Sequence, residues 1–206
     1  MSSARKLRRT ALHSGTSARR GVEGIEIVYD KLHRYDWQTP EMDAVITRLH
    51  RLANESPREA IPELLRMVER HPHVPLFYNY LAVAYSAVGD HERADETIEE
   101  NYRRNPDYLF ARVNYAELCL RDGDLEGCLQ ALGERLDLQA LYPHRRRFHI
   151  SELTGFTYAV GLYQLKTGDR DAARSSLELL RLVAPGDRAT KALERRLHPV
   201  RFLFRR

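Results

Sequence analysis

From about residue 41 onward, apolar side chains recur every three or four positions, the spacing of one face of an α-helix. The first two helical segments are marked by the apolar positions Met42, Val45, Ile46, Leu49 and Leu52, and then Ile61, Leu64, Leu65 and Val68. Further helices are expected over residues 75–88, 91–104, 108–122, 125–136, 151–167, 169–183 and 187–197. The pattern therefore predicts an all-α protein.

Residue pairs that favour turns separate these helices. They are Gly89-Asp90, Asn105-Pro106, Gly123-Asp124, Gly168-Asp169 and Pro185-Gly186. No convincing run of alternating strands interrupts the helical pattern. The one ambiguous stretch is Ile25–Tyr29, which fits either a strand or a short helix.

The turn glycines reveal an internal repeat. Gly89 and Gly123 are 34 residues apart, and the segments around them align without a gap: Leu81 over Tyr115, Ala82 over Ala116 and Ala94 over Cys128. A helix–turn–helix period of this length indicates stacked helical pairs, because one pair alone cannot bury its apolar face.

One unit carries a recognisable motif, Tyr78-x2-Leu81-Ala82-x2-Tyr85 followed by Ala94-x3-Ile98 and Pro106. Here the chain resembles the tetratricopeptide repeat family. The unit after it departs more from the family pattern, with Arg112, Cys119, Cys128-x3-Leu132 and Ala140 at the motif positions. The resemblance covers roughly residues 41–185. It implies an all-α, right-handed superhelical solenoid of about four antiparallel helix pairs.

The repeat register is interrupted once. Gly123 and Gly168 are 45 residues apart, which is 11 more than the repeat, and the extra residues lie around 139–153. We expect a basic N-terminal tail over 1–22, a cap or linker over 23–40, the repeat domain over 41–198 and a basic, aromatic tail over 199–206. The insertion fits either a solvated loop pinned by its apolar residues or a contact site for anions.

Positive charge is concentrated at the chain ends. The protein has 33 basic and 29 acidic residues, but residues 1–20 carry six bases and no acid, and the last six residues carry three more bases. Residues 21–200 therefore hold 24 bases against 29 acids. The candidate contacts for an anionic partner are Arg5, Lys6, Arg8, Arg9, Arg145, Arg146 and Arg147. A solvated tail without function is the other interpretation of the N-terminus.

The resemblance also implies a concave groove that binds a peptide, lined by the first helix of each repeat. Carried over by register, the groove residues are Leu76, Asn79, Tyr80, Val83, Phe110, Val113, Asn114, Glu117, Arg121, Tyr158 and Leu162. Only Asn114 fits the carboxylate-clamp pattern of the family, so we expect an apolar or amphipathic segment as ligand. The chain's own Ile25–Tyr29 or residues 200–204 are alternative occupants.

Catalytic and metal-binding signals are weak. The sequence lacks nucleotide-binding loops, a nucleophile elbow and a zinc-protease motif. Cys119 and Cys128 fall at core positions, nine residues apart, which is not a metal-ligand spacing. No transmembrane helix or secretory signal is visible. We expect no cofactor and no metal.

The sequence therefore predicts a non-enzymatic, cytoplasmic scaffold or adaptor that binds another protein or a peptide segment. A nucleic-acid-associated adaptor that uses the basic tail and Arg145–Arg147 is the alternative. An enzyme with an unrecognised pocket near the insertion is a third hypothesis. A homo-oligomer is left open.

Overall fold

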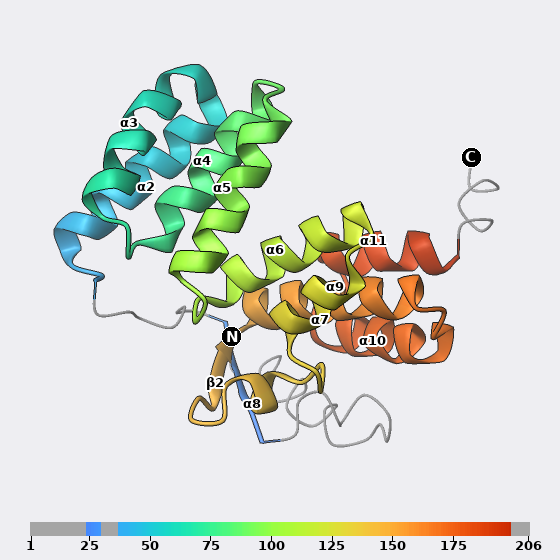
Figure 1. The fold of residues 1–206 in the computed structure, drawn as a ribbon. Coiled ribbons are helices and arrows are strands. Elements are labelled where there is room, and N and C mark those ends of the chain that lie inside the picture. The colour runs from blue at the N-terminus through green and yellow to red at the C-terminus, as the bar shows by residue number, and fades with distance from the viewer. Residues whose placement is uncertain (1–23, 30–36, 199–206) are drawn as a thin grey trace. The chain divides into compact units, whose positions relative to one another are not determined.

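The structure, a computed structural model, describes residues 24–29 and 37–198. In that part of the chain, ten helices and two short strands follow one another (Figure 1). Their bounds are β1 (Glu26–Val28), α2 (Pro40–Glu55), α3 (Pro57–Arg70), α4 (Pro75–Ala87), α5 (His91–Arg104), α6 (Leu109–Asp122), α7 (Leu125–Leu132), α8 (Leu138–Leu141), β2 (Arg147–His149), α9 (Ile150–Lys166), α10 (Arg170–Val183) and α11 (Arg188–Leu197). The described residues form two compact units, 37–118 and 24–29 with 119–198.

The helices predicted from residue 75 onward are confirmed, six of them to within one residue at each end. The exception is α7, which ends at Leu132 instead of residue 136. Gly133 follows it with a φ of 81°, a left-handed conformation that ends a helix and that glycine adopts without strain. α3, of which the sequence indicated only the apolar positions Ile61 to Val68, begins at Pro57 and holds Pro62 inside the helix.

Three of the predicted Gly-Asp turns share one geometry. Gly89, Gly123 and Gly168 have φ values of 84°, 85° and 85°. The aspartate that follows each glycine caps the next helix, because its side chain accepts a hydrogen bond from the main-chain N–H three residues later. This repeated turn explains why a Gly-Asp pair stands before α5, α7 and α10.

The unit of residues 37–118 packs α2–α5 against one another in sequence order (Figure 1). Its core contains the fully buried side chains of Leu49, Leu64, Val74 and Phe77. Trp37 packs against this core from outside the first helix. The core fixes α4 with one face inward, which leaves the opposite face for other contacts.

The second unit has its own core, in which α9, α10 and α11 pack together. Leu177, Leu180 and Leu193 are fully buried there. Gly161 lies where α9 meets α11: a Cβ atom at this position would stand 2.6 Å from the Leu193 side chain. The close approach of the two helices therefore requires a very small residue at position 161.

A short parallel sheet adds to the helical architecture. β1 pairs with β2 in the register Glu26–Arg147, Ile27–Phe148 and Val28–His149. The ambiguous stretch Ile25–Tyr29 is thus a strand in the structure. The insertion is neither a plain loop nor a lengthened helix, since it forms α8 and β2. Of the two interpretations of Ile25–Tyr29, the strand is therefore the one found in the structure, whereas the strand β2 was not predicted.

Candidate functional site on α4 and α6

α4 presents one buried face and one accessible face. Phe77, Tyr78, Leu81 and Tyr85 point into the core. The predicted groove residues of α4 lie on the other side, and Val83 is the most open of them, at 46% exposure. An apolar side chain this exposed is available for a partner, although an isolated one is also common on monomeric proteins. Its neighbours on the same face therefore decide whether it marks a site.

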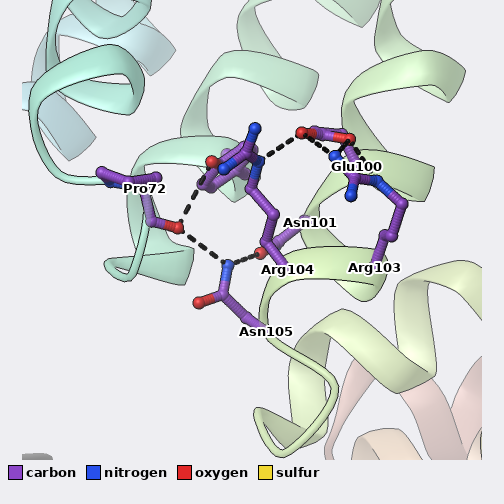
Figure 2. Close-up of polar contacts among 7 residues, drawn as sticks. Pro72, Glu100, Asn101, Arg103, Arg104 and Asn105 are labelled. Carbon is purple, nitrogen blue, oxygen red and sulfur yellow. Dashed lines mark hydrogen bonds and ion pairs between the residues drawn. The ribbon is translucent and has the colours of Figure 1, made fainter.

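The first neighbour is a ladder of asparagine amides that links α4 to α5 and α6. Asn79 Oδ1 accepts hydrogen bonds from Nδ2 of Asn101, at 2.9 Å, and from Nδ2 of Asn114, at 3.1 Å. Asn105 Nδ2 in turn donates to Asn101 Oδ1, at 3.0 Å, and to the carbonyl of Pro72, at 3.4 Å (Figure 2). All of these residues belong to one unit.

The buried amide of Asn101 fixes the orientation of Asn79, which in turn fixes that of Asn114. Asn101 is only 2% exposed, and its Nδ2 also donates to the carbonyl of Pro75. A buried amide requires partners, and each bond fixes the direction of the next side chain. Among the described residues, the Asn79 amide nitrogen and the Asn114 amide oxygen have no hydrogen-bond partner. Asn79 thus keeps its amide N–H groups, and Asn114 its amide oxygen, for other partners.

Aromatic contacts continue this face. The ring of Tyr80 lies 5.1 Å from that of His50 on α2. Burial raises the pKa of Tyr80 to about 12, so its hydroxyl stays protonated at neutral pH. Leu76 and Tyr80 also pack on the core of the unit. Their substitution would affect folding as well as binding.

The predicted groove residues of α6 differ in how much of their surface is exposed. Phe110 is half-buried and lies 5.7 Å, ring to ring, from Tyr108, while Glu117 is exposed. Val113 is only 4% exposed and therefore offers almost no surface to a ligand. Asn114 is the residue of α6 that joins the amide ladder. Val83 is consequently a better probe of this face than Val113.

The remaining predicted groove residues lie in the second unit. Tyr158 and Leu162 pack against the core that α10 and α11 share, and Arg196 Nη1 donates to the Tyr158 hydroxyl at 2.7 Å. Arg121 forms an ion pair with the neighbouring Asp122. The candidate site is therefore the α4–α6 face, defined by Leu76, Asn79, Tyr80, Val83, Phe110, Asn114 and Glu117.

The arginines of the insertion are used within the fold. Arg145 is paired with Glu152, and the two side chains are 13% and 2% exposed. Arg146 donates to the carbonyl of Gly24, and Arg147 forms an ion pair with Glu26. Arg145 is thus committed to a buried carboxylate, while Arg146 and Arg147 remain exposed. The other predicted anion contacts, Arg5, Lys6, Arg8 and Arg9, lie outside the described residues.

Clusters of metal-ligating side chains are absent from the described part of the chain. No group of three His, Cys, Asp or Glu side chains is placed there to hold one metal ion. Cys119 and Cys128 are buried free thiols, and burial raises the pKa of Cys128 to about 12. A shallow hollow of about 440 Å³ lies along α2, but Asp43, Ala44, Thr47, Arg48 and Arg51 of that one helix line it.

Sequence reasoning missed three residues of the site. His50 was not included, although α2 precedes the repeats in the same helical pattern. Asn101 and Asn105 were not recognised as ladder residues. A signal for Asn101 was present in the sequence, because an asparagine stands on the apolar face of an amphipathic helix, where a polar side chain requires a partner.

The comparison with known families agrees with the helical repeats. A tetratricopeptide repeat family model matches residues 109–134, which span α6 and α7. The match covers 26 of the 206 residues, and the repeats of that family generally mediate protein–protein interactions. The matched residues lie in the repeat unit whose motif positions depart more from the family pattern. No curated protein and no solved structure matches the chain.

Within 24–29 and 37–198, none of the helices combines the length and the apolar character that crossing a bilayer requires.

Proposed function

We propose that the protein is a non-enzymatic, cytoplasmic adaptor that binds an extended or amphipathic segment of another protein on the α4–α6 face. The observation that carries this proposal is the oriented amide pair of Asn79 and Asn114 beside the exposed Val83. An amide donor and an amide acceptor match the C=O and N–H groups of a peptide main chain.

The parts of the face suit different features of such a ligand. The amide pair would bind the main chain irrespective of sequence. Val83 and the rim of Phe110 would contact apolar side chains, and Glu117 would favour a basic one. The ladder behind Asn79 keeps the amides in place before the ligand arrives, which reduces the entropy lost on binding.

The alternative role in nucleic-acid binding has no comparable support. One of its predicted contacts, Arg145, is held by Glu152 and stacks over Phe148. An arginine in that position would have to leave a buried carboxylate unpaired in order to reach a phosphate, and that loss is unfavourable. Arg145 is therefore unsuited to a phosphate contact.

A peptide-library selection tests the proposal. The full chain is used to select displayed peptides, and the selected peptides are then titrated against two variants. Val83→Glu places a charge on the α4–α6 face, so it should weaken binding at least about tenfold, the effect of removing a central apolar contact. Leu65→Glu is the matched control, because Leu65 on α3 is equally exposed at 46% but lies outside the face.

The selected peptides should bind Leu65→Glu as they bind the unmodified protein. Both variants should keep the helical circular dichroism spectrum, since the substituted side chains are exposed. Equal binding to all three proteins, or equal loss in both variants, would remove the α4–α6 face from the account.

A further inference from the structure

The insertion forms a rigid support for β2. Phe148 of β2 is fully buried, and the guanidinium of Arg145 lies 4.4 Å from its ring centre. Arg145 is fixed in turn by Glu152, whose carboxylate also accepts a hydrogen bond from the main-chain N–H of His149, at 2.9 Å. This last contact belongs to the capping box that begins α9. β2 is therefore held from beneath by buried groups.

β1 lies on this support as an added strand (Figure 1). Glu26 N–H donates to the carbonyl of Arg146, at 2.6 Å. The Arg147 guanidinium lies 3.4 Å from the Glu26 carboxylate, and Arg146 Nη1 donates to the carbonyl of Gly24 at 3.4 Å. Each of the two exposed arginines of the insertion thus contacts the added strand.

The contacts of residues 24–29 indicate which side chains the edge of β2 accepts in a paired strand. Gly24 has a φ of 82°, and a Cβ atom there would stand 3.3 Å from Arg146 Nη1, so this end favours glycine. Two residues later an acid faces Arg147, and the half-buried Ile27 and Val28 follow. The accepted pattern is glycine, any residue, an acid and two β-branched apolar residues, in extended conformation and parallel to β2.

The added strand is held much less firmly than its support. The side chains of Glu26 and Arg147 are 64% and 70% exposed, and Tyr29 at the end of the segment is also exposed. Exposed ion pairs are screened by water, and a two-stranded sheet of three-residue strands is marginal by itself. Such a strand opens readily, while the β2 edge beneath it stays formed.

We propose that the edge of β2 is a docking site for an extended segment of a partner protein with this glycine–x–acid–apolar–apolar pattern, and that residues 24–29 occupy it as an internal competitor. The opened edge presents unpaired main-chain groups and two arginines, which a partner strand satisfies in the same way as β1. The site lies in the second unit and is independent of the α4–α6 face.

The competition has a definite consequence for affinity. A partner segment binds only to molecules in which β1 has left the edge, so its apparent affinity falls in proportion to that open fraction. Covalent attachment gives β1 a high effective concentration at β2. Weakening β1 should therefore strengthen binding of a segment supplied from outside, and fixing β1 should prevent it.

The test uses the full chain and a labelled synthetic peptide with the sequence of residues 24–29, followed by fluorescence anisotropy. Glu26→Pro removes both the N–H that donates to Arg146 and the carboxylate that faces Arg147, so the strand is released. Glu26→Cys with Arg147→Cys, oxidised, fixes the strand, since these two residues are Cα partners in the register. A peptide with arginine in place of its acid is the control ligand.

We expect the peptide to bind Glu26→Pro at least about tenfold more tightly than the unmodified protein, as a docked fraction of nine-tenths requires. The oxidised double variant should not bind it, and the arginine peptide should bind Glu26→Pro more weakly. Ile27→Asp, which places a charge on the half-buried strand, serves as a second releasing variant. Equal binding to the released and fixed proteins, or no binding to either released variant, would overturn the proposal.

Discussion

At the scale of single residues, the asparagine ladder has two functions that differ in their energetics. Its inner member, Asn101, satisfies main-chain and side-chain groups in a buried position. Its outer members, Asn79 and Asn114, receive their orientation from it and keep one amide group each for other partners. The same hydrogen bonds therefore support both the fold of the unit and the proposed ligand contact.

Replacing Asn101 should consequently destabilise the protein. Asn101→Leu leaves the carbonyl of Pro75 without its side-chain partner and removes the support of Asn79, and we expect the free energy of unfolding to fall by about 1–3 kcal/mol. Urea denaturation measures this change. The control is Asn54→Leu, because Asn54 is exposed and bonds only to the carbonyl of His50; it should stay within about 0.5 kcal/mol of the unmodified protein. A neutral Asn101→Leu would contradict a structural role for the ladder.

The buried thiols make a second prediction at this scale. Burial raises the pKa of Cys128 to about 12, so at pH 8 almost none of it is in the reactive thiolate form. A thiol reagent such as Ellman's reagent should leave Cys128 unmodified in the folded protein and modify it in concentrated guanidinium chloride. Mass spectrometry of the modified peptides gives the readout. Rapid modification of Cys128 in the folded state would show that the thiol is accessible.

At the scale of elements, α3 contains an internal conflict. Pro62 lies inside the helix and is exposed, so its ring interrupts the main-chain hydrogen bonds without filling the core. The proline raises the free energy of this helix relative to one with alanine. The helix persists because Ala60 and Leu64 on either side of the proline are fully buried.

Pro62→Ala should therefore stabilise the protein. Proline is about 3 kcal/mol less favourable than alanine in a helix interior, and its restriction of the unfolded chain offsets up to about 1 kcal/mol of that. We expect a gain of about 2–3 kcal/mol in the free energy of unfolding, visible as a higher urea midpoint with an unchanged slope. A lower midpoint would indicate that the ring makes a stabilising contact.

The elements also show how far the sequence could predict the structure. Six of the seven helices predicted from residue 75 onward were located to within a residue at each end, because helical periodicity and turn signals are local. Two features of the structure were not predicted. The end of α7 at Leu132 is one of them, since the positive φ of Gly133 is not indicated by the helical periodicity. The sheet joins residues 26–28 to residues 147–149, and no local pattern could indicate a pairing across more than a hundred residues.

The same reasoning applies to the candidate site. The repeat register assigned Asn79, Val83 and Asn114 to one groove. In the structure the side chains of Asn79 and Asn114 are hydrogen-bonded to each other, and Val83 is exposed. The register could not tell that Val113 is buried or that Arg145 is paired with Glu152, because both facts depend on which helices and side chains pack around them. Register predicts the face of a helix, and tertiary packing decides which residues on it are accessible.

At the scale of the whole molecule, the two units differ in charge. Residues 37–118 hold 9 basic and 14 acidic side chains, whereas residues 119–198 hold 13 basic and 11 acidic ones. The acidic excess of residues 21–200 thus resides in the unit that carries the α4–α6 face. Its field favours partners of opposite charge and repels acidic ones.

Ligands of the α4–α6 face should therefore carry net positive charge. We expect peptides selected by the full chain to be enriched in lysine and arginine, and their dissociation constants to rise several-fold between low and high salt, since ions screen exposed charges. Titration of one selected peptide at several salt concentrations measures the effect. Selection of acidic peptides, or an affinity independent of salt, would argue against this electrostatic contribution.

The most direct measurement of the central claim is hydrogen–deuterium exchange of the full chain with and without a selected peptide. The account predicts slower exchange in the peptides that cover residues 76–83 of α4 and 110–117 of α6, with little change in α10 and α11. It predicts the same map with Leu65→Glu and no protection with Val83→Glu. Protection confined to β2 or to α9–α11 in the unmodified protein would contradict the account, because the ligand would then bind away from the α4–α6 face.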